Sequence, residues 1–282
     1  MGIIIDGKLV AQENRIKIKD FVDNRIKNNL RVPCMAVILA GDDGGSVFYI
    51  NSEEKLCKKL GVRMKKVILD KNITQDSLID VIDKLNSDDE VDGIMLLLPL
   101  PENIDQKKVT SAISYKKDID CLTDINNGKF YKKEKSFIPC TAKAVIEAIK
   151  STKIDITGMN AVVIGRSNIV GKPVAQLLLN ENATVTVCHS KTKNLPEICK
   201  NADIVVSAVG RPHLINKGYI KKGAIVIDVG TTRVNGKIQG DVCFDDVKDE
   251  AGYITPVPGG IGSITTTMLL KNVCEAAEKN VY

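Results

Sequence analysis

The sequence predicts an α/β protein with two domains, each built around a parallel sheet. Continuous apolar runs such as Cys34 to Ala40 recur along the chain and have the length of buried strands. Segments with apolar residues at helical spacing separate these runs, in two series divided by a Lys-rich stretch at 115–135. Strands that alternate with helices form parallel sheets, and two separate series indicate two domains.

The first series covers residues 11–98. Its helices are expected at 11–28, 46–60 and 74–86, and its strands at 34–40, 62–69 and 91–98. Residues 41–45 form a turn, Ser46 is a suitable N-cap for the second helix, and Gly61 is a suitable stop. Pro99 and Pro101 end the third strand. These elements make a βαβαβ unit.

The second series follows the Lys-rich stretch, which is expected to consist of loops and a crossover. A helix at 141–151 leads into strands expected at 161–164, 184–188, 203–208 and 224–229. Helices are expected between them at 171–180 and 195–200. A Gly- and Pro-rich loop, ITPVPGGIGSITT, then precedes a C-terminal helix that runs to Lys279. This series predicts a second parallel sheet.

Composition argues against several classes of protein. The chain has 282 residues, a net charge of +5 and only 4% aromatic residues, so it lacks the concentrated basic face and aromatic platforms of a nucleic-acid binder. No apolar run approaches the ~20 residues of a membrane helix, and the N-terminus has no signal-peptide core. The eight cysteines form no CxxC pair and the chain has two histidines, so we expect reduced thiols, no metal site and a cytoplasmic location.

The strongest local signal lies after strand 161–164. The strand runs into Gly165, Ser167 and Gly171, and a helix follows. Gly165 permits a tight turn, Gly171 permits close approach of helix and strand, and free N–H groups at the helix start favour a pyrophosphate. The spacing is not GxGxxG, so a plain strand–helix turn is the alternative.

The next strand indicates which dinucleotide is bound. NAD sites usually have an acidic residue at the end of this strand, where it binds the ribose 2′-hydroxyl. Here TVTVC is followed by His189, Ser190 and Lys191, and Arg166 lies in the preceding turn. Basic and hydroxyl donors suit a 2′-phosphate, so the sequence favours NADP over NAD. His189 is alternatively a loop histidine without a role.

Two further strand ends carry small residues. Gly210 follows strand 203–208, and Gly230 and Thr231 follow strand 224–229. Ligands of doubly wound sheets bind at the carboxyl ends of the strands, so these residues could form a wall against the nicotinamide. Each could also be a simple turn residue.

Eight short segments in order along the chain match one known family; they are Ser46–Tyr49, Leu98–Pro101, Lys117–Asp120, Pro139–Thr141, Gly165–Pro173, Cys188–Ser190, Gly240–Val242 and Thr255–Gly262. Through them the chain resembles the bifunctional methylenetetrahydrofolate dehydrogenase/cyclohydrolase family along almost its whole length. The resemblance implies an N-terminal folate domain at 1–138, joined by the C-terminal helix at 263–282. It also implies a Rossmann-type NADP-binding domain at 139–262 and a homodimer.

The implied reaction is oxidation of 5,10-methylenetetrahydrofolate to 5,10-methenyltetrahydrofolate with NADP. By this resemblance Tyr49 stacks on the folate and Asp120 accepts hydrogen bonds from the pterin edge. Taken alone, Tyr49 could be a half-buried helix aromatic and Asp120 a turn residue. The remaining substrate-binding residues are expected to be Leu98, Gly259, Gly260, Ile261 and Thr265. Ile169 and Lys172 join the cofactor-binding residues named above.

The second family activity, hydrolysis of the methenyl bridge, relies on a Lys four residues after the tyrosine and on a Gln before the Leu-Pro-Leu-Pro motif. This chain has Glu53 and Leu97 at these positions. We count both among the candidate catalytic residues, although their identity puts the cyclohydrolase activity in doubt. A buried Glu53 would have a raised pKa and could still carry protons.

Four hypotheses follow from the sequence. The first is a dehydrogenase with weak or absent cyclohydrolase activity, and the second is a fully bifunctional enzyme. The third is a folate- or nucleotide-binding protein without catalysis. The fourth is a dehydrogenase for another substrate, which Ala142, Ala144 and Ser263 favour because the family usually has other residues there.

Overall fold

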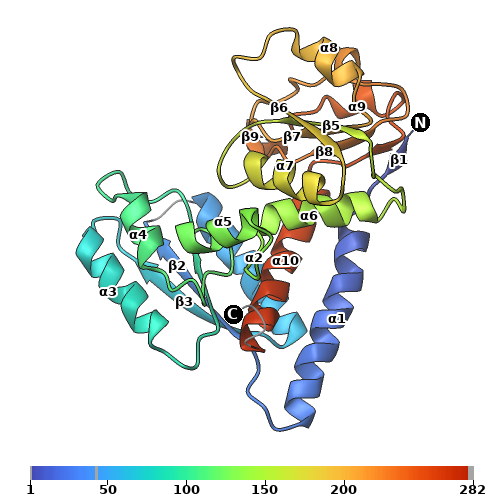
Figure 1. Cartoon of the computed structure of the whole chain (residues 1–282). Coiled ribbons are helices and arrows are strands. Elements are labelled where there is room, and N and C mark those ends of the chain that lie inside the picture. Colours follow the sequence, from blue (N-terminus) through green and yellow to red (C-terminus); the bar gives the residue numbers. More distant parts are fainter. Residues whose placement is uncertain (1, 42–43, 279–282) are drawn as a thin grey trace. The chain divides into compact units, whose positions relative to one another are not determined.

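A computed structural model describes residues 2–41 and 44–278 of the chain. These residues form two compact units, both visible in Figure 1. Unit 1 contains residues up to Glu13 together with 139–268. Unit 2 contains residues 14–138 and the chain from Leu269 onward. The chain is therefore an α/β protein of two units, as its two series of strands and helices predict.

Unit 1 is built on a parallel sheet of six strands in the order β1-β11-β8-β7-β5-β6. Its strands are β1 (Ile3–Ile4), β5 (Asn160–Ile164), β6 (Thr184–Cys188), β7 (Ile204–Ser207), β8 (Ile225–Asp228) and β11 (Tyr253–Ile254). From β5 the chain passes to β6 on one side and then to β7 on the other. Such a reversal of strand order is the switch point at which doubly wound sheets bind ligands.

Helices cover both faces of this sheet. Val162, Val205 and Val226 share a buried cluster with Cys199 of α8 (Leu195–Lys200), while the alternate residues Val163 and Val206 are buried on the other face. On that second face, α7 (Gly171–Asn180) contacts β5 and α6 (Cys140–Lys150) contacts β8. Figure 1 shows this division, with α6 and α7 on the opposite side of the sheet from α8.

Smaller elements complete unit 1 beyond β8. They are a hairpin of β9 (Thr232–Val234) and β10 (Lys237–Gln239), the 3-10 turn η1 (Lys217–Tyr219) and the short helix α9 (Phe244–Val247). None of them was expected, because segments of three or four residues carry too little periodicity to be recognised.

The beginning of the chain differs from the expected domain boundary. We expected residues 1–138 to form one domain, but β1 pairs with β11 in the unit 1 sheet. The N–H of Gly2 donates to the Lys248 carbonyl at 2.6 Å, and that of Gly7 to the Gly259 carbonyl at 2.9 Å. These backbone hydrogen bonds attach the residues up to Glu13 to unit 1, and α1 (Gly7–Lys27) then continues into unit 2.

Unit 2 contains a parallel sheet in the order β3-β2-β4, formed by β2 (Cys34–Ala40), β3 (Arg63–Leu69) and β4 (Gly93–Leu96). Ala36 and Ile38 face a core that includes Leu78 of α3 (Gln75–Asn86) and Val109 of α4 (Gln106–Ala112). The alternate residues of β2 are also buried, and α2 (Gly44–Leu60) packs against β2 and β3. A strand with both faces covered explains the continuous apolar run CMAVILA.

Two local predictions for unit 2 were wrong. Helix α2 begins at Gly44, so Ser46 lies inside its first turn and is not the N-cap. The Lys-rich stretch 115–135 is not only loop, because it contains α5 (Asp124–Tyr131), whose N-cap Thr123 accepts a hydrogen bond from the Asn126 N–H. Part of the expected turn at 41–45, residues 42–43, lies outside the described residues.

The C-terminal helix α10 (Ile261–Ala277) starts in unit 1 and ends in unit 2. It begins two residues before the expected start at 263, and residues 279–282 lie outside the described residues. In unit 2 the buried Asn272 amide donates to the carbonyls of Ile119, at 2.8 Å, and Ile138, at 3.1 Å. This amide therefore attaches the end of the chain to the segment just before residue 139.

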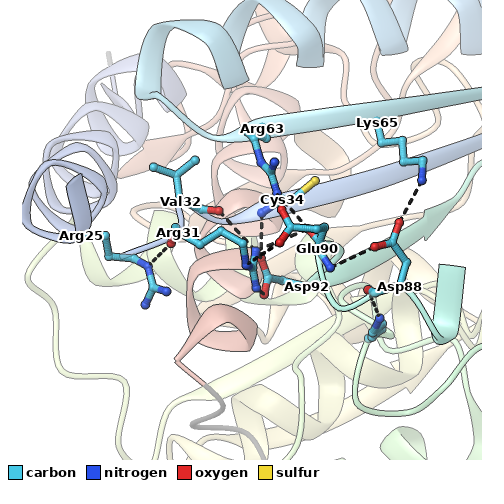
Figure 2. Close-up of polar contacts among 10 residues, drawn as sticks. Arg25, Arg31, Val32, Cys34, Arg63, Lys65, Asp88, Glu90 and Asp92 are labelled. Atoms are coloured by element: carbon cyan, nitrogen blue, oxygen red, sulfur yellow. Dashed lines mark hydrogen bonds and ion pairs between the residues drawn. The ribbon is translucent and has the colours of Figure 1, made fainter. Parts of the chain in front are cut away.

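A polar cluster joins the amino-terminal ends of the unit 2 strands (Figure 2). Asp92 accepts two hydrogen bonds from the Arg31 guanidinium, at 2.6 and 2.7 Å, and a third from the Cys34 N–H at 2.8 Å. Arg63 pairs with Glu90 at 2.6 Å, and Lys65 pairs with Asp88 at 2.9 Å. Only Asp92 is buried among these acids, so it is the member whose loss should matter most.

We expect Asp92→Ala to lower the free energy of unfolding by about 3 kcal/mol, because it leaves a partly buried guanidinium and a buried N–H without their acceptor. Urea unfolding of the variant and the wild type checks this. Asp245→Ala is the control, since the Asp245–Lys248 pair is at the surface and its loss should leave stability unchanged. Equal stability of the two variants would show that the Arg31–Asp92 pair contributes nothing.

Candidate dinucleotide site and folate-type site

The carboxyl ends of four unit 1 strands lie in one row. Ile164, the last residue of β5, is in register with Cys188 at the end of β6 and with Ser207 at the end of β7. Ser207 is in turn in register with Asp228 at the end of β8. The segments that follow these strands therefore leave the sheet at one edge. The structure brings together the candidate residues that the sequence placed after each strand.

The turn after β5 requires its two glycines. Gly165 has φ +122°, and a Cβ there would lie 2.3 Å from the Ala208 carbonyl oxygen. A Cβ on Gly171 would lie 2.2 Å from the Gly165 carbonyl oxygen. Both distances are far below contact, so the backbone approaches itself here more closely than any side chain allows.

Between these glycines the turn presents unused backbone donors. The N–H groups of residues 166–169 have no hydrogen-bond acceptor within the described part of the chain. The sequence predicted free N–H groups at the start of α7. In the structure these groups are used, because the Gly171 N–H donates to the Ser167 hydroxyl at 3.3 Å and the Lys172 N–H donates to the Ser167 carbonyl at 3.1 Å. The anion-binding donors therefore belong to the turn.

Basic and hydroxyl side chains surround this turn. Arg166, Ser167, Ile169 and Lys172 are exposed, and Lys172 donates to Asn168 at 2.8 Å. After β6, His189 accepts the Lys191 N–H on Nδ1 at 3.1 Å. Ser190 beside it is exposed. The end of β6 thus presents donors and no carboxylate.

Two buried aspartates that we did not predict hold the ends of β7 and β8. Asp241 accepts hydrogen bonds from the Ser207 hydroxyl at 3.0 Å and from the N–H groups of Val209 and Arg211, each at 2.8 Å. Gly210 lies between these two donors and has φ +64°. Asp241 therefore fixes the course of the segment that carries Gly210.

Asp228 acts in the same way on the end of β8. It accepts from the N–H groups of Gly230, Asp241 and Val242 at 2.9 to 3.0 Å. Burial raises the pKa of Asp228 to about 6, although these three donors lower it. The exposed Thr231 follows directly. The sequence feature that could have indicated this role is the acidic residue at the end of the apolar strand IVID.

Unit 2 carries Tyr49 and Glu53 on one face of α2. They are four residues apart, so Glu53 lies one turn after Tyr49. Tyr49 is partly exposed, whereas Glu53 is 1% exposed. Neither Glu53 oxygen has a hydrogen-bond partner within the residues that the structure describes. Burial raises the pKa of this carboxyl to about 7, against the lowering influence of Tyr49 and of Arg15 on α1.

The other unit 2 candidates follow β4 or lie near it. Leu97 is buried and donates its N–H to the Ile38 carbonyl at 3.0 Å, and Leu98 precedes a cis peptide bond to Pro99. Asp120 is partly exposed, two residues after Asp118, which forms a bridge with Ile94 of β4. Asp118 is itself buried and accepts from the N–H groups of Leu122 and Thr123, both at 2.8 Å.

The remaining substrate candidates lie at the start of α10, in unit 1. Gly259 has φ +106°, and a Cβ on Gly7 would lie 2.1 Å from the Gly260 carbonyl oxygen, so this loop packs tightly against the start of α1. Ile261 is buried and Thr265 is partly exposed. The substrate candidates are thus divided between the two units.

Sites of two other kinds are absent from the described residues. Within residues 2–41 and 44–278, no three His, Cys, Asp or Glu side chains are grouped so that they could hold a metal ion. No helix in these ranges has both the length and the apolar character of a membrane span.

A parallel sheet whose strand ends carry a glycine turn with unused N–H groups defines a dinucleotide-binding α/β protein. The two units also match family profiles. Residues 5–120 match the catalytic domain of tetrahydrofolate dehydrogenase/cyclohydrolase, and residues 139–281 match its NAD(P)-binding domain. The chain belongs to the tetrahydrofolate dehydrogenase/cyclohydrolase family, which confirms the resemblance seen in the sequence.

Relatives and solved structures agree over the full length. Bifunctional protein FolD of Clostridium novyi is 62% identical over 98% of this chain and 99% of its own, and that of Clostridium beijerinckii is 58% identical over 100% of both. The bifunctional FolD enzyme of Campylobacter jejuni has a TM-score of 0.96 and 40% identity, over 99% of this chain and 100% of its own. The Trypanosoma brucei enzyme, solved with NADP cofactor and an inhibitor, has a TM-score of 0.94 and 39% identity, over 99% and 98%.

Proposed function

We propose that this protein oxidises 5,10-methylenetetrahydrofolate to 5,10-methenyltetrahydrofolate with NADP+. The observation that carries the proposal is the row of strand ends in unit 1, where a turn with unused N–H groups lies beside donors at the end of β6. Membership in the family, over both its domains, supports the substrate.

The residues at this edge suit NADP. The N–H groups of residues 166–169 would bind the pyrophosphate, and Gly165 and Gly171 allow the close approach. Arg166, His189 and Ser190 would hold the 2′-phosphate, since no carboxylate is there to repel it. When bound, NADP+ supplies the acceptor for the hydride. The Trypanosoma brucei relative solved with NADP supports this choice.

Other residues would orient the two ligands. Gly210, Gly230 and Thr231 would border the nicotinamide, with Asp241 and Asp228 holding their segments in place, and Ile169 and Lys172 would border the rest of the cofactor. Tyr49, Leu98 and Asp120 would bind the folate, together with the loop residues Gly259, Gly260, Ile261 and Thr265. Catalysis by such a site consists mainly of alignment of the two reactants.

The second family activity is a second candidate for this chain. Relatives 55 to 62% identical to it are named bifunctional, which supports hydrolysis of the methenyl product to 10-formyltetrahydrofolate. Glu53 and Leu97 are the positions on which that activity depends. Resemblance to the family also supports a homodimer and a cytoplasmic location, which sedimentation analysis and cell fractionation would test.

Turnover of the purified protein with 5,10-methylenetetrahydrofolate tests the proposal. We expect NADPH to form with NADP+, and NADH to form much more slowly with NAD+ at equal concentration. NADPH and methenyl product are followed separately, so that dehydrogenation and hydrolysis are measured independently. No NADPH from a protein that binds NADP would contradict the proposal and favour another substrate or a non-catalytic role.

A further inference from the structure

Asp241 contacts both of the segments that follow β7 and β8. Its side chain is fully buried, with 0% exposed. Oδ2 accepts hydrogen bonds from the Ser207 hydroxyl at 3.0 Å and the Val209 N–H at 2.8 Å, and Oδ1 accepts the Arg211 N–H at 2.8 Å. A Cβ on Gly230 would lie 2.4 Å from the same Oδ1. One carboxylate therefore binds the segment after β7 and packs directly against the segment after β8.

Asp228 holds Asp241 in this place. Its side chain is 3% exposed and accepts the N–H groups of Gly230 at 2.9 Å, Asp241 at 3.0 Å and Val242 at 2.9 Å. A Cβ on Gly240 would lie 2.0 Å from Asp228 Oδ2, so the chain before Asp241 also runs directly against this carboxylate. The two acids interlock, because the side chain of Asp228 binds the backbone of Asp241.

The same pair reaches the loop that leads into α10. Asp228 donates its own N–H to the hydroxyl of the buried Thr255 at 2.8 Å. The Cβ of a residue at Gly240 would also lie 2.9 Å from the Val257 side chain. The loop that carries Gly259 follows directly. Three segments at this edge of the unit 1 sheet are thus anchored to two carboxylates.

Two buried carboxylates so close together are unfavourable for the fold. Burial raises the pKa of Asp228 to about 6, and Asp241 adds to this rise, although the three N–H donors lower it. At neutral pH Asp228 is still ionised, so both of its oxygens remain acceptors. Hydrogen bonds to a carboxylate are about twice as strong as those between neutral groups. The pair therefore supplies rigidity at this edge more than net stability.

We propose that Asp241, held by Asp228, is a positioning residue for hydride transfer. This inference rests on the proposed function, which places Gly210, Gly230 and Thr231 against the nicotinamide. Asp241 acts through the segments that carry these residues, because it fixes how far apart they lie. A displacement of about 1 Å in such an alignment can lower a rate about a hundredfold.

The affinity for the cofactor should depend little on this pair. The groups proposed to bind its phosphates are the N–H groups of residues 166–169 and the side chains of Arg166, His189 and Ser190. Within the described residues, no side-chain hydrogen bond of Asp241 or Asp228 reaches these groups. Loss of an Asp241 acceptor should therefore slow hydride transfer while NADP stays bound.

Steady-state turnover and NADP titration of Asp241→Asn test this. Asparagine has one acceptor oxygen, so either the Val209 or the Arg211 N–H is left unbound. We expect kcat for NADPH formation to fall about a hundredfold and the Kd of NADP to stay within about threefold of the wild type. With substrate deuterated at the methylene carbon, the isotope effect on kcat should rise, because hydride transfer then limits the rate.

Asp203→Asn is the matched control. Asp203 precedes β7 at the opposite, amino-terminal edge of the same sheet, where it accepts the Asn160 N–H at 3.0 Å and pairs with Lys221 at 2.6 Å. The same substitution there removes an acceptor of a backbone N–H far along the strand from the proposed nicotinamide site. This variant should keep the kcat and the isotope effect of the wild type.

Ser207→Ala serves if Asp241→Asn does not fold, since it removes one donor to Asp241 and leaves the carboxylate in place. Its kcat should fall about fivefold, again with little change in the Kd of NADP. A folded Asp241→Asn with the kcat of the wild type would overturn the proposal. So would a loss of NADP affinity as large as the loss of kcat, or an unchanged isotope effect. Absence of NADPH formation by the wild type would instead refute the proposed function.

Discussion

Replacing Gly171 by valine is expected to weaken NADP binding by at least about a hundredfold, which corresponds to about 2.7 kcal/mol. A Cβ at this position would lie 2.2 Å from the Gly165 carbonyl oxygen and 2.8 Å from the Arg166 nitrogen. Both atoms are backbone, so no side chain can rotate away. The turn with the free N–H groups must move as a whole, and its donors then no longer converge on a pyrophosphate.

Titration of NADP by calorimetry, on variants whose circular dichroism matches the wild type, measures this effect. If the valine variant does not fold, Gly171→Ala replaces it in the titration, because alanine adds the same Cβ with less bulk. Gly128→Ala is the matched control, because a Cβ on this glycine of α5 meets nothing within 4 Å. It should leave NADP binding unchanged and slightly favour the helix. A Kd for the Gly171 variants within threefold of the wild type would contradict the assignment of this turn.

The strands and the longer helices could be predicted because their signals are local. β2, β6, α7 and α8 have the bounds that their apolar runs, glycines and prolines indicate. Residues that end parallel strands must also meet at one edge, so the candidates Gly165, His189 and Gly230 could be grouped from the amino-acid sequence alone.

Pairing between distant segments could not be predicted in this way. β1 and β11 have two residues each, so the sequence could not show that the first residues of the chain pair with the unit 1 sheet. The roles of Asp228 and Asp241 depend on N–H groups up to 32 residues away. Such hydrogen bonds leave no periodic trace in the sequence.

Glu53 joins both kinds of information. The sequence shows an acid one turn after Tyr49, but an acid on α2 that was exposed to solvent would be an ordinary surface residue. Burial without a hydrogen bond is what makes the residue chemically unusual. The same burial also has a cost for stability, and that cost depends on pH in a way that can be measured without substrate.

We expect the stability of the wild type to fall, relative to Glu53→Gln, by about 3 kcal/mol between pH about 4.5 and pH about 8. In the unfolded chain this carboxyl releases its proton near its ordinary pKa of 4.5, whereas in the folded protein burial raises the pKa to about 7. Between these values the unfolded state binds fewer protons, so the free energy of unfolding decreases as pH rises. Above about pH 8 both states are ionised and the loss is complete.

Urea unfolding of wild type, Glu53→Gln and Glu54→Gln at several pH values measures the difference. Glutamine has the shape of glutamate and no titration, so the Glu53→Gln curve lacks this one contribution and keeps the rest. Glu54 is partly exposed and ion-paired, and its variant should follow the wild type in slope with pH up to 8. Parallel curves for wild type and Glu53→Gln would mean that the carboxyl is solvated or paired in solution.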